Sequence, residues 1–297
     1  TTVFGVTTSL GLGTVQISAG LGHIFGINET FNNQILIITF ITLIGLISVS
    51  LGLDSGIKKL SQINMILATS LLLLIFLLGP TIFIINALIQ NFGAYINTLI
   101  QSATWTEVYS DSSWQNGWTL FYYSWWFAWA PFVSLFIARI SYGRSIKEFI
   151  VGVLFVPSLI VFIWMGVFGN AAIYQVINET SQISEMVSNN LPVALFTLFD
   201  VYPIAQVLSV LSLILIVTFF VTSSDSGALV ASMLSSKNLT DIGDDSPILS
   251  RATWAILLGI LAAVLLYAGG LTALQTSVVI TGVPFAVIVV FACRQFY

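Results

Sequence analysis

Long apolar runs recur along the chain, and they constrain its fold more than any other feature. Eight of them reach the length of about 20 residues that a helix needs to cross a bilayer. They lie at residues 2–21, 33–53, 65–88, 118–139, 148–172, 203–233, 251–270 and 273–293. Only 7% of the 297 residues are charged, against about 25% in soluble domains. The sequence therefore predicts an all-α integral membrane protein.

The basic residues predict how these spans are oriented. Every Lys and Arg falls at a connection on one side, after the second, fourth, sixth or eighth run: Lys58, Lys59, Arg139, Arg144, Lys147, Lys237, Arg251 and Arg294. The loops on the other side, roughly 22–32, 89–117, 173–202 and 268–272, carry none. By the positive-inside rule, we expect a multi-pass protein of the inner (plasma) membrane with both ends of this chain in the cytoplasm.

Two segments on the outer side are not simple turns. Residues 86–105 and 178–203 have apolar residues at helical spacing with polar residues between them. This pattern is typical of helices that lie along the membrane interface. Ordinary packing of an extracellular cap would give the same periodicity, so both interpretations stay open. The chain begins TTVFG and ends RQFY after an apolar run, and we expect it to be a piece of a longer membrane protein.

The composition excludes several classes of function. One cysteine, Cys293, and one histidine, His23, cannot form a disulfide framework or a cysteine-based metal cluster. An enzyme would need a nucleophile with a base, or a metal cluster, and a channel typically shows rings of repeated filter residues; neither pattern is visible. No basic patch suits nucleic acid. We expect a non-enzyme without a cofactor, whose partners are a small molecule and membrane lipid.

The fourth run carries an unusual set of aromatic residues. On a helical wheel, seven residues fall within an arc of roughly 100°: Trp118, Tyr122, Trp125, Trp126, Trp129, Val133 and Phe136. Aromatic residues in membrane helices normally gather at the interfaces. Trp125, Trp126 and Trp129 lie about 10 to 17 Å down the helix, at 1.5 Å per residue, and so approach the middle of the bilayer.

Indole rings in mid-membrane suit a quaternary ammonium group. Such a group has no N–H to donate, and the face of an indole compensates its diffuse charge by about 2 kcal/mol when the contact is dry. A packing stripe is the alternative, because large aromatic side chains also fill helix interfaces. Pro131 follows the cluster and removes a backbone donor, which in membrane helices is typical of a cavity or a moving segment.

The stretch from 117 to 148 resembles the signature of the betaine/choline/carnitine transporter (BCCT) family. The matching elements appear in order: GWT, the WWxxW of the three central Trp residues, PFV, ARIS and GRSIKE. SLGLGTVQ (9–16) and TSSDSG (222–227) are similar to the fifth and tenth helices of the family. Three positions depart from the usual pattern, at Tyr123, Ser134 and Tyr142. Tyr123 replaces a usual Trp, so the resemblance defines the class of substrate better than its identity.

The resemblance implies a fold and a division of the chain. Family members have twelve spans around an inverted five-helix-repeat (LeuT-like) transporter core. This chain would hold the fifth to the twelfth span, a core incomplete at the N-terminal side. Residues 1–88 would be the last three helices of the first repeat, 89–116 an outer interfacial helix and loop, and 117–297 the second repeat. Relatives of this kind work by alternating access and are typically homotrimers.

The resemblance also assigns roles to individual residues of the fourth run. Trp125, Trp126 and Trp129 would line the substrate pathway together with Tyr122, with Trp126 as the direct wall of the cage. Two further aromatic residues would act as gates above and below the cage: Phe121 and Phe136. Ordinary buried packing is nearly as good an explanation for each gate.

The stretch 219–236 is expected to hold a coupling ion. In sodium-coupled relatives, a Thr–Ser pair supplies hard oxygen ligands, and the matching residues are Thr222 and Ser223, with the carbonyl of Phe219 as a further candidate. Asp225 lies one turn nearer the cytoplasm, and we interpret it as a helix-shaping or gating residue. A second sodium site would use Thr2, but Val6 stands where another Thr is expected.

The overall hypothesis is a secondary transporter that imports an onium compound such as glycine betaine, choline, carnitine or dimethylsulfoniopropionate by sodium symport. Sodium-independent exchangers of the family carry an arginine in the fifth helix, and no Arg or Lys occurs in residues 1–57. Proton coupling or exchange remains open, as does a transporter of the same fold for another amine or amino acid.

Overall fold

The computed structural model describes residues 1–51, 56–110, 112–236 and 246–294. Within these ranges the chain is helical with no β-strand, which confirms the predicted all-α class. Seven of the described helical segments are long and apolar enough to cross a membrane. Lys237, one of the basic residues used to predict the orientation, lies outside the described residues.

The elements follow one another as helices joined by short connections. Their bounds are α1 Thr2–Phe25, α2 Phe31–Leu51, α3 Lys58–Leu78, α4 Thr81–Ala103, η2 Gln115–Leu120, α5 Phe121–Ile140, α6 Ile146–Ile150, η3 Val151–Phe155, α7 Val156–Ile177, α8 Ile183–Asn189, η4 Leu191–Val193, α9 Ala194–Phe199, α10 Ala205–Ser235 and α11 Ile248–Cys293.

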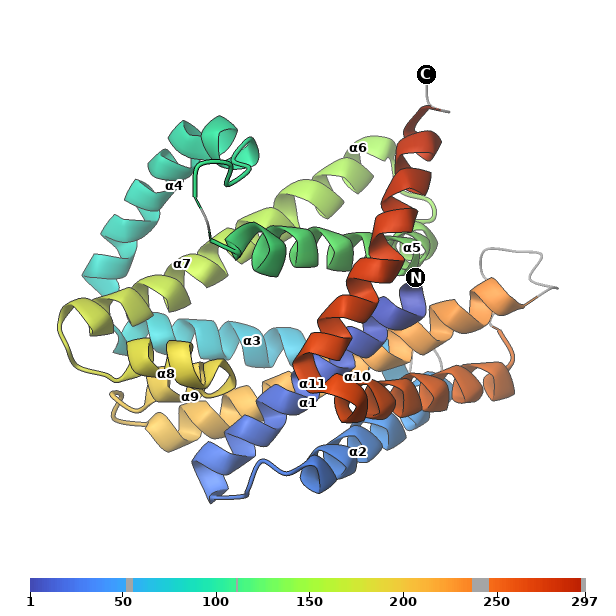
Figure 1. The fold of residues 1–297 in the computed structure, drawn as a ribbon, viewed down its shortest axis with the longest axis horizontal. Coiled ribbons are helices and arrows are strands. Elements are labelled where there is room, and N and C mark those ends of the chain that lie inside the picture. The colour runs from blue at the N-terminus through green and yellow to red at the C-terminus, as the bar shows by residue number, and fades with distance from the viewer. Residues whose placement is uncertain (52–55, 111, 237–245, 295–297) are drawn as a thin grey trace.

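Four helices, α1, α2, α10 and α11, pack together as one group across the lower part of Figure 1, from which the end of α11 rises toward the C-terminus. Leu10 of α1, Ile41 of α2 and Leu274 of α11 are almost fully buried in its core. Small residues allow the close approach: a Cβ on Gly13 of α1 would stand 2.2 Å from the Phe220 ring of α10. Packing of small residues against neighbouring helices is the usual way in which membrane helices associate.

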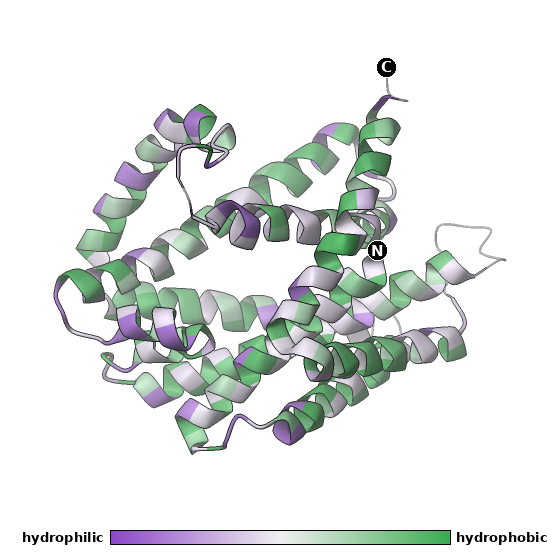
Figure 2. Ribbon diagram, viewed as in Figure 1, coloured by the Kyte–Doolittle hydropathy of each residue, from purple (hydrophilic) through white to green (hydrophobic). Residues whose placement is uncertain are grey.

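A second group contains α3 and α7, with α8 and α9 packed at one end. Its core includes Leu71 and Ile75 of α3, Val167 and Ala171 of α7, and Phe199 of α9. The outer surfaces of both groups are largely apolar (Figure 2), which agrees with a chain that faces lipid on many sides.

The predicted third span, 65–88, is corrected by a break in the chain. α3 ends at Leu78 and α4 begins at Thr81, with Gly79 and Pro80 between them. Pro80 cannot continue the backbone hydrogen bonds of α3 and starts a new helix instead. The helix expected at 86–105 therefore begins earlier and is long enough to be one of the seven candidate spans. Its place along the membrane interface, and the division into repeats, stay predictions.

The predicted outer segment 178–203 is a set of short helices instead of one long surface helix. α8, η4 and α9 turn within it, and Phe196 and Phe199 of α9 are fully buried. This part of the chain packs as a cap over the ends of the longer helices, as the alternative interpretation had it. His23, at the end of α1, joins the cap through a contact of 3.0 Å between its Nε2 and Asp200 Oδ1.

The last two predicted spans form the two helical parts of α11, which are separated by non-helical backbone and a sharp change of direction at Gly269 and Gly270. Gly270 has φ of 58°, a left-handed conformation that glycine adopts without steric penalty. The turn expected at this position is confirmed.

The first predicted span forms α1, but α1 is not one of the seven helices that are apolar enough to be candidate spans.

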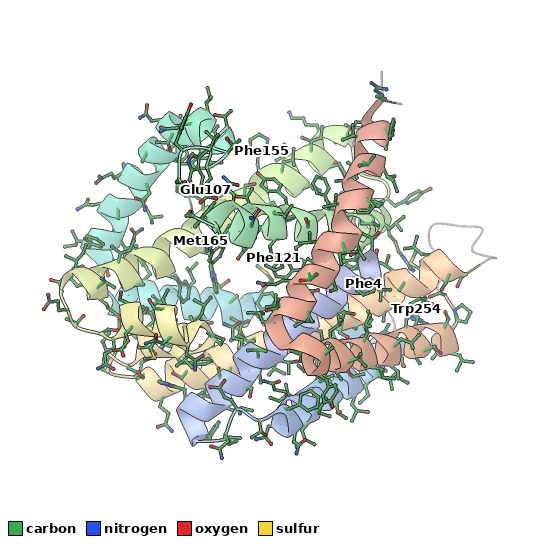
Figure 3. All side chains as sticks on the ribbon, viewed as in Figure 1. Phe4, Glu107, Phe121, Phe155, Met165 and Trp254 are labelled. Atoms are coloured by element: carbon green, nitrogen blue, oxygen red, sulfur yellow. The ribbon has the colours of Figure 1, made fainter. Side chains whose placement is uncertain are left out.

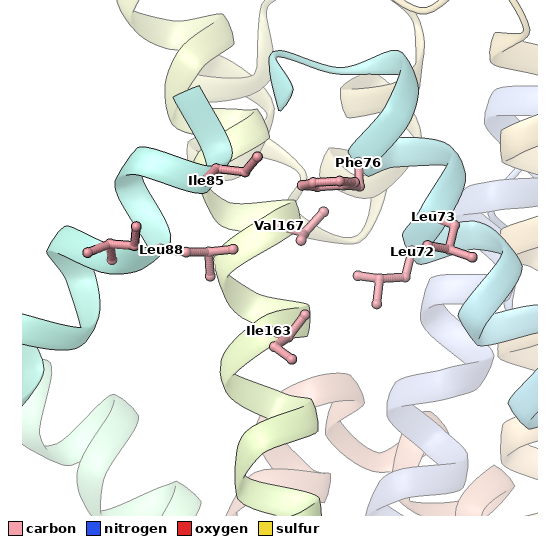
Figure 4. A pocket seen from close by; sticks show the side chains of 8 residues that line it. Leu72, Leu73, Phe76, Ile85, Leu88, Ile163 and Val167 are labelled. Carbon is pink, nitrogen blue, oxygen red and sulfur yellow. The ribbon is translucent and has the colours of Figure 1, made fainter. Parts of the chain in front are cut away.

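An entirely apolar cavity lies between α3, α4 and α7 (Figure 4). Its volume is about 380 Å³, and it is lined by Leu72, Leu73, Phe76, Ile85, Leu88, Ile89, Ile163 and Val167. These side chains offer no polar or aromatic-cage chemistry with which to recognise a charged solute.

Candidate substrate cavity and ion site

The aromatic residues of the fourth predicted span meet α1 and α10 around one cavity. Its volume is about 340 Å³, within the usual range for small-molecule sites. α5 contributes Tyr122, Trp125, Trp126, Trp129 and Val133, α10 contributes Phe220 and Ser223, and α1 contributes Ser9. The four predicted substrate-binding residues are therefore brought together, and one predicted sodium ligand, Ser223, lies in the same wall.

The polar edges of two indoles are held by α1. Trp129 Nε1 donates to Gly5 O at 3.1 Å and to Ser9 Oγ at 3.2 Å. Trp125 Nε1 reaches Ser9 Oγ at the same distance. Ser9 is 3% exposed and donates its own hydrogen to Gly5 O. The indole N–H groups are hydrogen-bonded to α1 and are not available to a ligand. A ligand in the cavity would therefore contact the faces of the rings.

Gly5 allows this arrangement by bringing α1 and α5 close together. A Cβ at that position would stand 3.0 Å from Trp129 Cδ1 and 3.1 Å from the carbonyl carbon of Ala128. Both distances are tighter than ordinary van der Waals contact. A larger residue at position 5 would separate the two helices and lengthen the indole hydrogen bonds.

Trp126 occupies a different position from its two neighbours. Its side chain is 72% exposed, the most of any aromatic residue in the cavity wall. The α-helical step of 100° per residue turns it away from α1 while it still lines the cavity. Trp126 is therefore the indole with the largest free surface.

The three predicted sodium ligands lie on one turn of α10. Thr222 Oγ1 donates to Phe219 O at 2.8 Å, and Ser223 Oγ donates to the same carbonyl at 3.0 Å. Hydroxyl and carbonyl oxygens are the hard ligands that sodium prefers, by extension from other hard cations. The donor set fits a sodium ion in chemistry, and Ser223 connects it to the aromatic cavity.

Asp225 lies deeper in the packing of α10 and is fully buried. Ser48 of α2 donates to its Oδ2, and Ser226 donates to its Oδ1 at 3.1 Å. The carboxyl group thus joins α10 to α2 and does not line the aromatic cavity. This geometry agrees with its interpretation as a helix-shaping residue.

The whole chain, residues 1–297, matches the model of the betaine/carnitine/choline family transporters. The chain belongs to this family. It is 41% identical over 293 residues to a glycine betaine transporter of Acinetobacter baylyi, covering 98% of this chain and 44% of that protein. A glycine betaine/proline/choline/ectoine transporter of Vibrio parahaemolyticus is 40% identical, with 98% and 51% covered. The glycine betaine transporter OpuD of Bacillus subtilis is 39% identical, with 100% and 57% covered.

Membership of this family confirms the resemblance seen in the sequence and indicates a multi-pass membrane transporter instead of an enzyme. The chain spans about half the length of the curated relatives that it matches. The activity and substrate of the whole protein are therefore taken up below as proposals.

The two predicted gates of the family pattern do not line the aromatic cavity. Phe121, on α5 (Figure 3), is 7% exposed and stacks on Trp125 with ring centroids 5.4 Å apart. Phe136 lies fifteen residues further along the helix, about 22 Å away at 1.5 Å per residue. It packs near Phe132 and borders a separate cavity with Lys58 and Arg144. The two lie on opposite sides of the cavity along α5, and their gating roles stay predictions.

Three residues near the site were not assigned a role from the sequence: Ser9, Phe220 and Asn64. Each belongs to a helix other than α5. Ser9 begins the SLGLGTVQ stretch and Phe220 lies in the stretch 219–236, but neither side chain was singled out there, and no motif includes Asn64. For the second sodium site, Val6 is 1% exposed and packs against Gly227, so its side chain contributes to the core.

Proposed function

We propose that the full-length protein is a secondary transporter that imports a quaternary ammonium or sulfonium compound, with glycine betaine as the first candidate. The observation that carries the proposal is the cavity between α1, α5 and α10, where indole N–H groups are engaged by Ser9 and Gly5 and indole faces are left for a ligand. A trimethylammonium group needs no hydrogen-bond acceptor and is attracted by such faces.

The absence of ionisable groups from the cavity wall favours the same class of ligand. None of the eight lining residues is an acid or a base. Among these lining residues, a primary ammonium group would find only the hydroxyl oxygens of Ser9, Tyr122 and Ser223 in place of its hydrogen bonds to water, whereas an onium group has no N–H to satisfy. The names of the relatives include glycine betaine and choline, which are quaternary ammonium compounds and support this class. One of those names also includes proline and ectoine, which carry N–H groups and fit the alternative of a transporter for another amine or amino acid. Choline, carnitine and dimethylsulfoniopropionate are the next candidates.

The coupling ion in this proposal is sodium, moved by symport with alternating access. Two observations support it. Ser223 borders the cavity while its hydroxyl shares Phe219 O with Thr222, so substrate and ion would meet at neighbouring positions. The first 57 residues carry no Lys or Arg that could stand in for a cation.

The proposed setting is the plasma membrane, with the ends of this chain in the cytoplasm because every basic residue falls on one side of the predicted spans. A homotrimer is the proposed assembly, by analogy with the family. Cross-linking in membranes would test the trimer, and accessibility labelling of single cysteines in the loops would test the orientation.

The decisive test of the substrate class is Trp126→Ala in the full-length protein. Because Trp126 is 72% exposed, its loss should leave folding nearly intact. Removal of one cation–π contact of about 1 kcal/mol, the value for an exposed aromatic face, predicts a drop in kcat/KM for labelled glycine betaine of about fivefold. Trp126→Phe should retain part of the activity. Trp254→Ala, which removes an indole bonded to Ser235 outside the cavity, is the matched control.

Equal uptake by Trp126→Ala and the unmodified protein, at equal amounts in the membrane, would contradict the aromatic cage. The coupling ion is tested separately, by replacing sodium with choline-free potassium buffer at constant pH. Sodium symport predicts loss of uptake; full uptake in the absence of sodium would favour proton coupling or exchange and leave the cage untouched.

A further inference from the structure

Asn64 is a buried polar residue that belongs to neither the cavity nor the predicted ion ligands. It lies on α3 with 2% of its surface exposed. α3 packs directly against α10, which carries the predicted sodium ligands. The side-chain amide of Asn64 is bonded to the turn of α10 that carries Thr222.

The amide nitrogen of Asn64 makes two contacts with α10. Nδ2 donates to Thr222 Oγ1 at 3.1 Å and to Thr218 O at 3.2 Å. Thr222 in turn donates its single hydrogen within its own helix, to Phe219 O at 2.8 Å or to Thr218 O at 3.1 Å. Both hydrogens of the Asn64 amide are therefore directed at the atoms that decide where the Thr222 hydroxyl points.

This pattern determines which part of the Thr222 oxygen remains free. A hydroxyl has one hydrogen and two lone pairs. The hydrogen is used inside α10 and one lone pair accepts from Asn64, so one lone pair is left for a cation. Each of the two carbonyls that can accept the Thr222 hydrogen also accepts from one other side chain, Thr218 O from Asn64 and Phe219 O from Ser223. Without Asn64, the Thr222 oxygen would lose the only side-chain donor that it has from another described helix, and its position would depend on α10 alone.

The other end of the amide carries a free-energy cost. Asn64 Oδ1 is buried, and no hydrogen-bond donor in the described part of the chain reaches it. An unsatisfied buried acceptor is destabilising by about 1–3 kcal/mol. Leucine has nearly the same size and would avoid this cost. Gln175 Oε1 is in the same position, so the case for Asn64 rests on its two donors, both of which are directed at α10.

We propose that Asn64 is a positioning residue for the coupling ion: its amide holds the Thr222 hydroxyl with one lone pair free for sodium. The proposal rests on sodium coupling through Thr222, as proposed above. It also gives α3 a direct connection to the ion turn, so that a movement of α3 relative to α10 would alter the ion site without touching the substrate cavity.

The test is a double-mutant cycle in the full-length protein, read as the sodium concentration that gives half-maximal uptake of labelled glycine betaine. Asn64→Leu removes the amide, and Thr222→Val removes the hydroxyl. Loss of one positioning hydrogen bond predicts an increase in half-saturating sodium of about five- to tenfold for Asn64→Leu, with the KM for betaine at saturating sodium changed by less than about twofold. Asn64→Asp, which keeps the shape but loses both N–H groups, should not restore the sodium affinity.

The cycle distinguishes positioning from packing. If Asn64 acts through Thr222, the double variant should need no more sodium than Thr222→Val alone, because coupled residues are not additive. Gln175→Leu is the matched control, since Gln175 is also a buried amide that donates to another helix, at Leu198 O, and has an oxygen without a donor among the described residues. Gln175→Leu should lower the amount of protein in the membrane without altering the sodium concentration that gives half-maximal uptake (the sodium constant).

Two results would overturn the proposal. One is an unchanged sodium constant for Asn64→Leu in a protein whose uptake depends on sodium and on Thr222. The other is a sodium constant that rises by the same factor in the presence and absence of the Thr222 hydroxyl. Uptake by the unmodified protein that ignores sodium would instead refute sodium coupling itself, so the two failures are separable.

Discussion

α1 and α7 show opposite relations between hydropathy and burial. The segment that contains α7, Ile146–Ile177, has the highest mean hydropathy of the candidate spans, 2.5, and only 6% of its most apolar window is buried. α1 is too polar to be selected as a span, yet fourteen of its 24 residues are buried, among them Thr7, Thr8, Ser9 and Thr14. In a bilayer the solvent is apolar, so large apolar residues can face the lipid while small and polar residues pack against other helices.

Functional side chains are therefore expected on the helices that bury polar residues. α1 supplies Ser9 and Gly5 to the candidate cavity, packs Gly13 against Phe220, and bonds Thr8 Oγ1 to Leu274 O of α11. α7 supplies Val167 to an apolar cavity and packs mainly against α3 and α4. Substitutions that are alike in chemistry should therefore differ sharply in effect between the two helices.

The largest contrast is expected between two glycines. In Gly13→Ala, the new Cβ would stand 2.2–2.4 Å from three atoms of the Phe220 ring, including Cγ, so the whole ring must move. Overpacking of this kind destabilises by about 3 kcal/mol at its upper end, and it also displaces a wall of the cavity. Gly169→Ala in α7 meets nothing within 4 Å and should be neutral. Thermal unfolding in detergent, followed by size-exclusion of a fluorescent fusion, measures both.

Equal melting of the two alanine variants would remove the basis for the comparison, because it would mean that α1 is not packed more tightly than α7. If Gly13→Ala loses betaine uptake but melts normally, Phe220 would still be part of the cavity wall. Gly13 would then matter for the shape of the site and not for stability.

The second contrast concerns leucines. Leu10 of α1 is 1% exposed and Leu159 of α7 is 62% exposed. Leu10→Ala leaves a cavity in the core and should destabilise by about 2 kcal/mol, the low end of the usual range, because the unfolded chain in a bilayer is also in apolar surroundings. Leu159→Ala removes only contacts with lipid and should change the melting temperature very little. A melting temperature for Leu159→Ala as low as that for Leu10→Ala would indicate that α7 has a protein partner on that face.

The same contrast explains what the sequence could predict about the fold. α2, α10 and the turn at Gly269 and Gly270 follow from apolar runs and punctuating residues. The break at Gly79 and Pro80 was missed because the run stays apolar on both sides, although a Gly-Pro pair is itself a signal of a turn. The buried cap formed by α9 was one of two interpretations that the sequence left open, because the periodicity of a surface helix and that of a packed one are alike.

For the candidate site, sequence reasoning found the side chains that form a local motif and missed those that come from elsewhere. Trp125, Trp126 and Trp129 share one helix face, so their convergence follows from spacing. Asn64 is 158 positions from Thr222, and nothing in its neighbourhood indicates the contact. Ser9 was hidden among many hydroxyls, because Ser and Thr in membrane helices commonly bond to their own backbone.

The smallest contrast is the one between two serines, and it tests how the indoles are held. Ser9→Ala removes one acceptor from Trp125 and Trp129, but Gly5 O remains within 3.4 Å and 3.1 Å of their Nε1 atoms. Since each indole keeps one partner, the loss should be about 1 kcal/mol, or about fivefold in KM for betaine. Ser158→Ala in α7, where the exposed hydroxyl bonds only to Leu154 O, should leave KM unchanged. A loss of a hundredfold or more for Ser9→Ala would mean that the Ser9 hydroxyl contacts the substrate directly, whereas an unchanged KM would mean that Gly5 O alone orients both rings.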